Sequence, residues 1–388
     1  MKNILIYNQD EPLPEQGGIE RMTDLLAGEL QRIGNTVNIL CARHNRLNKE
    51  YNSPVPVYYI PGANPQHFII DLLSELNIEI VIDQTEGGIV GPYGYFKARA
   101  KALDNVKLIA VQHSSRRAVL KNTKLIFGKS GSNFIQKSAA WLYNNTILRI
   151  RYVHFLWNAY MVHKNLAVNY DRVVTLSSAF IDDFIHYYSK ANREKIVAIP
   201  NPNTYESCAQ SAMEKRVLFV GRLRNNPKGL DKLLKIWDKI EREYPDWTLD
   251  IVGDGEDRLS LECLSKKLNL KKVVFHGYQD PSPFYQKASI FCMTSMYEGF
   301  PMVLNEAMVH GVVPIAFNTF GAARDIIEDG DCGFLIAPYD IDEYAEKLSK
   351  LMSSSDTLSV MSKNAVAHSK SFSRGKVIEK WETLLKSV

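Results

Sequence analysis

Two glutamates stand eight positions apart in the segment SMYEGFPMVLNEAMVHG, residues 295–311. Glu298 lies in a Gly-Phe-Pro loop, and Glu306 lies about one turn into the helix that the next apolar residues predict. A carboxylate has two acceptor oxygens, so it can bind both hydroxyls of a vicinal diol. The start of a helix also offers free N–H groups, here near Met302 and Val303, to phosphate. The segment predicts a site for hydroxyls and phosphate; the alternative is an exposed loop acid and a partner for the helix dipole.

Two basic residues follow another predicted strand, in the sequence GRLRNNPKGLDKL at residues 221–233. The side chains of Arg222 and Lys228 are spaced so that both can reach one anion. Two cations around a diphosphate would stabilise the negative charge that builds up when it departs. The alternative is a solvated basic loop.

Three more candidates follow strands in the first half of the chain. Gly17 and Gly18, in QGGIER, stand between the first predicted strand and helix, where glycine lets the backbone approach a ligand closely. His113 ends the predicted strand in AVQHSS. An ordinary flexible loop and a structural histidine are the alternatives. The glycines do not form GxGxxG, which disfavours a dinucleotide-dependent dehydrogenase.

The elements that must position these residues alternate between strand and helix, which predicts parallel sheets. In the first half we expect strands at 2–8, 36–42, 78–84, 106–114, 171–178 and 195–203, and helices at 19–34, 67–77 and 94–103. In the second half we expect strands at 216–223, 247–255, 272–278, 288–295, 312–318 and 332–338, and helices at 229–245, 258–270, 303–311 and 341–354. Polar, turn-rich sequence near residue 200 separates the halves. This pattern predicts an α/β protein with two doubly wound domains, whose ligands bind where the strands end.

The length and composition agree with two globular domains. The chain has 388 residues, and a single core stops growing at roughly 250–300 residues. No stretch approaches the ~20 apolar residues that span a bilayer, and the first residues fit a strand better than a signal peptide. The five scattered cysteines have no metal-ligand spacing, which favours a reduced, cytoplasmic protein.

Residues 105–170 contain no Asp or Glu but many basic and aromatic residues. Such a segment, expected to form helical hairpins, is typical of binding to an anionic membrane surface. The alternative is a solvated helical lid over a soluble acceptor. We do not expect nucleic-acid binding, because no nucleic-acid module is visible.

Over nearly its whole length, the chain resembles the family 4 retaining glycosyltransferases of the GT-B fold. The residues that carry the resemblance are GGIER, IPNPN, GRL…KG, IVGDG and, most specifically, EGFPMVLNE, which is similar to the family's E-x7-E signature. The resemblance implies a GT-B fold: two Rossmann-like domains that face a deep inter-domain cleft. It implies an acceptor domain at residues 1–200, a nucleotide-sugar donor domain at 201–373, and a terminal helix at 374–388 that crosses back onto the first domain.

The resemblance also implies roles for the candidate residues. Arg222 and Lys228 would bind the donor diphosphate, Glu306 the donor ribose, and Glu298 the transferred sugar. His113 would lie near the donor sugar and the acceptor. The remaining donor-binding positions would be Gly17, Gly18, Tyr278, Gly299, Phe300, Pro301, Met302 and Val303. Pro301 departs from the glycine that many members have, and it lacks an N–H.

The implied reaction transfers a hexose or N-acetylhexosamine from a nucleotide sugar, with UDP favoured, to a glycan or lipid-linked acceptor with retention at the anomeric carbon. Neither a metal nor another cofactor is expected, because the two cations would take the metal's place. The implied setting is surface-polysaccharide synthesis at the cytoplasmic face of the inner membrane. Two alternatives on the same fold are a non-catalytic sugar-nucleotide-binding subunit and a UDP-sugar epimerase.

Overall fold

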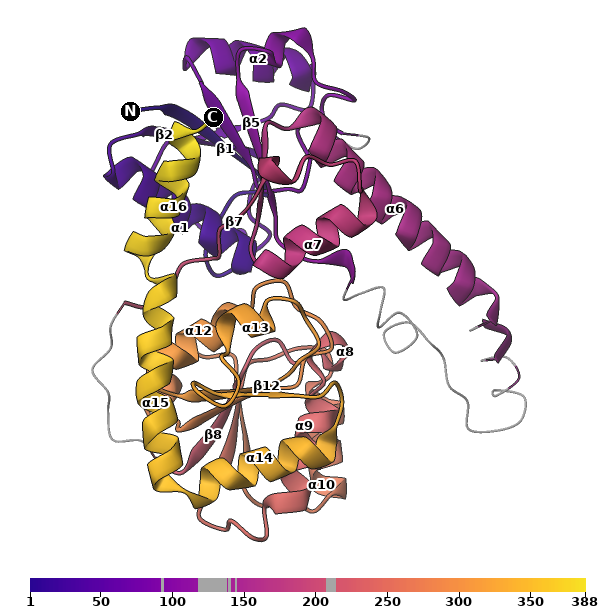
Figure 1. The fold of residues 1–388 in the computed structure, drawn as a ribbon, viewed down its shortest axis with the longest axis vertical. Helices are drawn as coiled ribbons and strands as arrows, with labels where there is room; N and C mark the ends of the chain where they lie inside the picture. Colours follow the sequence, from indigo (N-terminus) through magenta and orange to yellow (C-terminus); the bar gives the residue numbers. More distant parts are fainter. Residues whose placement is uncertain (92–93, 118–137, 139–140, 144, 207–213) are drawn as a thin grey trace. The chain divides into compact units, whose positions relative to one another are not determined.

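Two parallel β-sheets organise the protein, as a computed structural model shows (Figure 1). The structure describes residues 1–388 except 92–93, 118–137, 139–140, 144 and 207–213. The chain divides into two compact units: unit 1 contains residues 1–116, 151–202 and 374–388, and unit 2 contains 117–150 and 203–373.

Unit 1 is built on a seven-stranded sheet with the order β3-β2-β1-β4-β5-β6-β7, all parallel. Its strands are β1 (Asn3–Asp10), β2 (Thr36–Arg43), β3 (Val57–Tyr59), β4 (Ile80–Asp83), β5 (Lys107–Gln112), β6 (Arg172–Thr175) and β7 (Ile196–Ala198). Its helices are α1 (Gly18–Arg32), α2 (Pro65–Glu75), α6 (Ile147–Asn169), α7 (Ser178–Tyr187) and α16 (Arg374–Lys386), with short 3-10 turns η1 (Lys101–Leu103) and η2 (Arg193–Lys195). The terminal helix α16 packs against α1 (Figure 1).

Unit 2 repeats this plan with six parallel strands in the order β10-β9-β8-β11-β12-β13. The strands are β8 (Arg216–Val220), β9 (Thr248–Val252), β10 (Val273–Gly277), β11 (Ile290–Met293), β12 (Val313–Phe317) and β13 (Phe334–Ile336). The helices are α8 (Asn225–Lys228), α9 (Leu230–Ile240), α10 (Arg258–Lys267), α11 (Ser282–Tyr285), α12 (Met302–Val309), α13 (Ala323–Ile326), α14 (Ile341–Ser353) and α15 (Ser355–Ser369), followed by η3 (Lys370–Phe372).

Both sheets are covered by helices on their two faces, so their central strands are almost continuously apolar. β1 is buried from Ile4 to Tyr7, and β12 is buried from Val313 to Phe317. In unit 2 the helices add a wide apolar face: Trp237 of α9 and Tyr344 of α14 are fully buried in the core. The predicted α/β class with two Rossmann-like halves is therefore confirmed.

One local expectation differs from the structure. Residues 94–103 were expected to be a helix, but only η1 forms there. Gly94 donates to the Gly91 carbonyl in a turn, and Arg99 is held away from helix geometry by an ion pair with Asp171 (2.8 Å). Within 105–170 the described residues include β5 and the long helix α6, and the rest of the segment for which helical hairpins are expected lies largely outside the described residues.

Candidate functional site

The site in unit 2 lies where the strand order reverses. β8 and β11 are neighbours, and the connections that leave them run to opposite sides of the sheet. The loops that follow two such strands form the ligand-binding crevice of doubly wound sheets. Here these loops are residues 221–229 and 294–301, which hold most of the residues that the sequence singles out.

Lys228 and Glu298 meet directly across these two loops. The Lys228 Nζ lies 2.7 Å from Glu298 Oε1, and the two side chains are 23% and 15% exposed. Two further contacts join the loops: Thr294 Oγ1 donates to the Lys228 carbonyl (3.1 Å), and the Met296 N–H donates to the Pro227 carbonyl (2.7 Å). The ion pair is thus built into the scaffold and is not a loose surface contact.

Gly229 is the residue that lets the two loops come this close. Its φ of 68° lies in the left-handed region, which other residues adopt at a cost. A Cβ at this position would also lie 2.3 Å from the backbone oxygen of Thr294. Glycine is required here for both reasons, and it directly follows Lys228.

Arg222 supplies a second positive charge in the same loop. Its side chain is exposed, and among the described residues it has no ion-pair partner. The neighbouring Arg224, by contrast, pairs with Glu256 (2.8 Å). Arg222 therefore has a guanidinium available for an anion, and Arg224 does not.

Glu306 is buried on α12, one helix beyond Glu298. Its side-chain carboxylate accepts a hydrogen bond from the Tyr285 hydroxyl (3.0 Å), and its exposed fraction is only 2%. A carboxylate this deeply buried needs strong partners, because desolvation of a charge is costly. Its backbone carbonyl accepts from His310 Nδ1 (2.7 Å), and the His310 ring stacks on Tyr285.

Pro301 occupies the N-cap position of α12, so its missing N–H does not interrupt the helix. Met302 and Val303 are the first two helical residues, and their N–H groups have no preceding turn to donate to. No side chain caps this end of α12. Gly299 and Phe300 form the loop that leads into it, and the Phe300 ring is buried against Phe372.

Tyr278 directly follows β10, and its side chain is 76% exposed. It has no place in the cluster of Lys228, Glu298 and Glu306 that the structure describes. Only its backbone, at the end of the strand, keeps the position that the resemblance implies for nucleobase binding.

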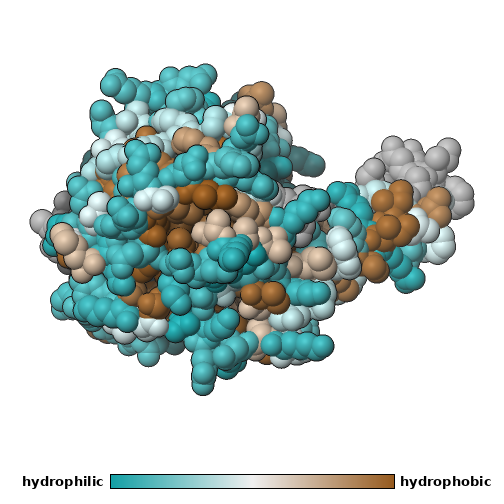
Figure 2. Space-filling model, turned by 90° about the horizontal axis from the view of Figure 1, so that it is seen from above, coloured by the Kyte–Doolittle hydropathy of each residue, from teal (hydrophilic) through white to brown (hydrophobic). Residues whose placement is uncertain are grey.

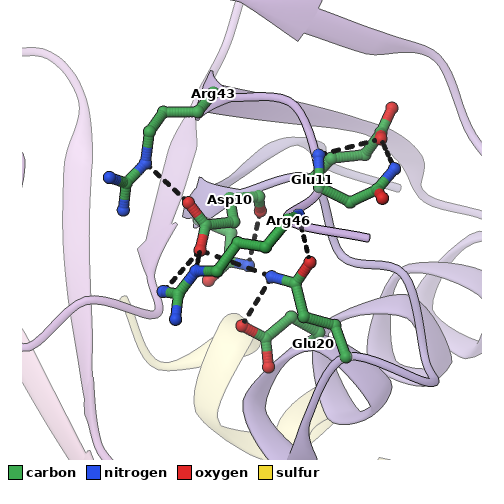
Figure 3. A network of polar contacts seen from close by, with 8 residues as sticks. Asp10, Glu11, Glu20, Arg43 and Arg46 are labelled. Carbon is green, nitrogen blue, oxygen red and sulfur yellow. Dashed lines mark hydrogen bonds and ion pairs between the residues drawn. The ribbon is translucent and has the colours of Figure 1, made fainter. Parts of the chain in front are cut away.

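In unit 1, a polar network holds the loop that leads to Gly17 and Gly18 (Figure 3). The buried Asp10 carboxylate pairs with Arg43 (2.7 Å), the last residue of β2, and with Arg46 (2.6 Å) in the loop that follows it. Gln16 joins the same network, because its side-chain oxygen accepts from the Arg46 N–H (2.6 Å). The remaining members of the network are Asn8, Glu11, Glu20 and Asn45.

The paired glycines begin α1. Gly17 is its N-cap with an extended backbone (φ 177°), which any residue adopts, and Gly18 is its first residue. A Cβ on Gly17 would meet only the flexible end of the Glu20 side chain. The fold itself therefore makes little demand for glycine at position 17, and no side chain caps the helix.

His113 follows β5, and burial lowers the pKa of its imidazole to about 4, although a bond to the Gln84 backbone opposes this shift. Its backbone N–H donates to Glu86 Oε1 (3.2 Å). Its Nε2 is buried and has no hydrogen-bond partner among the described residues. His113 is therefore neutral at physiological pH, with one ring nitrogen unused by the fold.

The structure thus brings Lys228, Glu298, Arg222 and Glu306 to one end of the unit 2 sheet, while Gly17, Gly18 and His113 belong to unit 1. Sequence reasoning missed Tyr285 and His310. Tyr285 is 21 residues from Glu306 in an unremarkable helical turn, so no local pattern indicates their contact. His310 follows Glu306 at the helical spacing of four, a signal that could have been used.

In the described part of the chain, no three His, Cys, Asp or Glu side chains gather as metal ligands would, and none of the helices there has both the length and the apolar composition of a membrane span.

Two family models match the chain, one in each half. The model described as "Glycosyltransferase Family 4" matches residues 16–203, and the model described as "Glycosyl transferases group 1" matches residues 206–368. The first match ends at residue 203, and the second begins at residue 206.

The chain is also similar to curated proteins. It is 33% identical over 382 residues to an uncharacterized glycosyltransferase of Haemophilus influenzae, which covers 95% of this chain and 96% of that protein. It is 29% identical over 223 residues to an undecaprenol-linked-glycan alpha-1,4-N-acetyl-D-galactosaminyltransferase of Campylobacter jejuni, covering 57% of this chain and 62% of that one.

Two solved structures share the fold over the whole chain. Anabaena Alr3699/HepE in complex with UDP-glucose superposes with a TM-score of 0.72 at 19% identity, covering 100% of both chains. The apo form of the lipopolysaccharide outer core galactosyltransferase WaaB superposes with a TM-score of 0.67 at 18% identity, covering 100% of this chain and 99% of that one. With these folds, a family match in each half and a relative aligned over nearly the full length, the chain belongs to glycosyltransferase family 4, of the GT-B fold.

Proposed function

We propose that the protein is a retaining glycosyltransferase that moves a hexose or N-acetylhexosamine from a UDP-sugar to a glycan or lipid-linked acceptor. The observation that carries the proposal is the pairing of Lys228 with Glu298 across the loops after β8 and β11, beside the exposed Arg222. A sugar diphosphate has an anionic diphosphate and sugar hydroxyls. A cation can bind the first and a carboxylate the second, and here both lie where the strand order reverses.

The donor would be held by groups of unit 2. Lys228 and Arg222 bind the diphosphate, the buried Glu306 accepts from the ribose hydroxyls, and Glu298 accepts from hydroxyls of the transferred sugar. The first N–H groups of α12 add positive potential from the helix dipole. In the absence of donor, the carboxylate of Glu298 neutralises Lys228, so the arriving phosphate competes for this cation.

In the reaction, the bond between the anomeric carbon and the diphosphate oxygen breaks, and its electron pair stays on the diphosphate. The acceptor hydroxyl attacks the same face, and its proton passes to the departing phosphate oxygen. Retention follows from attack and departure on one face. Lys228 and Arg222 stabilise the leaving charge, the role that a metal plays in other transferases.

The similar proteins support this choice of substrates. HepE and TarM have been crystallised with UDP, HepE also with UDP-glucose, and WaaB is a lipopolysaccharide galactosyltransferase. Other relatives are named for amylovoran biosynthesis and for lipopolysaccharide 1,6-galactosyl transfer. A role in surface-polysaccharide synthesis, at the cytoplasmic face of the inner membrane, is the setting we propose.

We further propose that α6 docks peripherally on an anionic membrane. Its first half exposes apolar side chains, among them Ile150 and Val153 (69% and 63% exposed), and the helix carries no acidic residue. Figure 2 shows such hydrophobic side chains on the arm at the right of the view. Arg149 and Lys164 are exposed on the same helix. Apolar insertion plus basic charge favours the surface of an anionic bilayer.

The donor is tested by thermal stabilisation with UDP-, GDP- and ADP-sugars and with NAD. A ligand at ~100 times its Kd adds roughly 2.7 kcal/mol to the free energy of unfolding. We expect a UDP-sugar to stabilise the protein. Arg222→Ala should abolish most of this effect, whereas Arg224→Ala, on the same loop, should keep it. Stabilisation by NAD alone, or equal effects of the two variants, would contradict the proposal.

Retention is tested by the configuration of the product. With the stabilising donor and an acceptor that yields product, the NMR coupling at the new anomeric centre should match that of the donor sugar. An inverted centre would exclude the same-face reaction.

A further inference from the structure

A cavity lies within unit 1, at the carboxyl ends of β4 and β5. Its volume is about 240 Å³. Its walls are the loop after β4, the residue Arg116 beyond β5, and one face of α6. The lining residues are Thr85, Glu86, Gly87, Gly88, Arg116, Trp157, Asn158, Met161, Val162 and Asn165. None of the donor-site candidates predicted from the sequence is among them, although Arg116 and the lining residues of α6 belong to the acid-free segment 105–170.

Helix α6 is the element that shapes the cavity. Trp157, Met161 and Asn165 recur every four residues, so they share one face of the helix. The adjoining face, with Ala159 and His163, is buried in the body of unit 1. Trp157 remains 55% exposed, so its ring borders the cavity without being enclosed.

Two of the lining residues, Arg116 and Glu86, form an ion pair. Arg116 lies 3.3 Å from Glu86 Oε2 and donates to Asn158 Oδ1 (2.9 Å). Its Nε is buried and has no hydrogen-bond partner among the described residues. Glu86 itself has a φ of 55°, an uncommon conformation for a residue other than glycine, and such strain is found preferentially at functional sites.

Glu86 connects the cavity to the end of β5. Its Oε1 accepts from the backbone N–H of His113 (3.2 Å), while its Oε2 faces Arg116. Burial raises the pKa of Glu86, and the adjacent Arg116 opposes this shift. A molecule in the cavity would therefore contact a residue that is hydrogen-bonded to His113, which the resemblance places near the donor sugar and the acceptor.

We propose that this cavity binds one neutral sugar residue of the acceptor. Trp157 offers an aromatic face, while Arg116 and the amide of Asn158 offer hydrogen bonds to hydroxyls. Glu86 already balances the single positive charge, that of Arg116. A ligand with a phosphate or a carboxylate would therefore gain no net attraction, and the Glu86 carboxylate would repel it. The inference rests on the proposed function, because it assigns the acceptor of that same reaction.

The test is saturation-transfer NMR on the full chain, with the methyl glycosides of glucose, galactose and N-acetylglucosamine as probes. Methyl glucuronide and glucose 1-phosphate serve as anionic comparisons. We expect at least one neutral glycoside to show transfer that Trp157→Ala reduces more than fivefold. Trp141→Ala is the matched control, since Trp141 is 67% exposed and does not line the cavity.

A second variant, the pair Glu86→Gln and Arg116→Met, removes both charges and should weaken the same signal. UDP affinity, measured in parallel, should be unchanged in all these variants. The proposal is overturned if no neutral glycoside gives a signal, if Trp157→Ala matches the wild type, or if the anionic probes bind more tightly. If the wild type binds the glycoside but does not bind UDP, the proposed donor is refuted and the assignment of the cavity stands.

Discussion

At the scale of single residues, buried and partly buried charged side chains are held in two different ways. Glu306 is 2% exposed and stays in place through the hydroxyl of Tyr285. Lys228 and Glu298 neutralise each other at 2.7 Å. Removing one member of such a pair leaves the other charge partly buried and unpaired. The side chains of the proposed donor site thus already have partners before any ligand arrives, and each variant must be interpreted with its partner in mind.

Tyr285→Phe tests whether this hydroxyl positions Glu306. The ring and its stacking on His310 remain, so the fold should be preserved. Losing a hydrogen bond to a charged group costs about 1.5–3 kcal/mol. We expect the KM for the donor to rise at least tenfold with a smaller change in kcat. Tyr244→Phe, which removes a hydroxyl bonded to the Ser349 carbonyl, is the control. Equal kinetic parameters in wild type and Tyr285→Phe would show that the bond has no positioning role.

The pKa of His113 gives a prediction about pH. Folding lowers the pKa to about 4 from an ordinary value near 6.5, so between these values the unfolded chain binds more protons than the folded one. The contribution of His113 to the free energy of unfolding is therefore fully present above about pH 6.5. It falls as the pH drops toward 4, by at most ~1.4 kcal/mol per pH unit. His163, whose pKa is also lowered to about 4, contributes in the same direction.

Urea unfolding at pH 7.0 and 5.5 measures this effect. His113→Asn should lose less stability than the wild type between the two values, and His67→Asn, at an exposed histidine, should behave as the wild type. The same pH dependence in wild type and His113→Asn would contradict the assignment.

At the scale of elements, close approach of the loops after β8 and β11 depends on Gly229. Gly229→Ala meets both a left-handed φ, at a cost of roughly 1–2 kcal/mol, and the Thr294 backbone oxygen 2.3 Å away. Gly330→Ala is matched, because Gly330 also has a positive φ (81°) but open space around it. We expect Gly229→Ala to lower the Tm more than Gly330→Ala and to weaken UDP binding. Normal UDP affinity and Tm in Gly229→Ala would show that the loop tolerates a side chain.

The strands could be predicted from the sequence because a parallel sheet covered on both faces needs nearly continuous apolar runs, as in β1 and β12. The strand-end positions of Arg222, Lys228 and Glu298 followed from the same alternation. The helix expected at 94–103 failed because its apolar spacing competes with a glycine turn and with the ion pair of Arg99. The ion pair joins Arg99 to Asp171, 72 positions away in the sequence.

Contacts between distant residues also limited what could be predicted of the sites. The pairing of Lys228 with Glu298 spans 70 residues, and the bond from Tyr285 to Glu306 joins two separate helices. No local pattern encodes either contact. The cavity at Glu86 was missed because its polar residues come from three segments, none of which forms a motif by itself.

At the scale of the whole molecule, the chain consists of two doubly wound units, and each carries one part of the proposed reaction. The proposed donor site belongs to unit 2, and the proposed acceptor cavity belongs to unit 1. The terminal helix α16 is part of unit 1, where Arg172 donates to the Ser387 carbonyl (3.1 Å). The last segment of the sequence therefore stabilises the first sheet.

The proposed membrane docking is tested on the whole protein. Flotation with vesicles of phosphatidylglycerol and phosphatidylcholine should carry the wild type, while pure phosphatidylcholine vesicles should not. Ile150→Glu combined with Val153→Glu should abolish flotation, because both the apolar contact and the charge balance are lost. Val360→Glu, at a residue 58% exposed on α15, is the control. If the wild type stays in the bottom fraction, without vesicles, at low salt, α6 is not a membrane anchor.

Titration calorimetry with UDP and with uridine measures whether Lys228 binds the diphosphate of a nucleotide sugar, as we propose. Lys228→Ala removes the cation and leaves Glu298 to repel the diphosphate, so UDP affinity should fall at least tenfold, about 1.4 kcal/mol. Uridine affinity should not change, and Lys235→Ala, which breaks an exposed pair with Asp231, should bind both ligands as the wild type does. Unchanged UDP affinity in Lys228→Ala, or an equal loss for uridine, would contradict the claim.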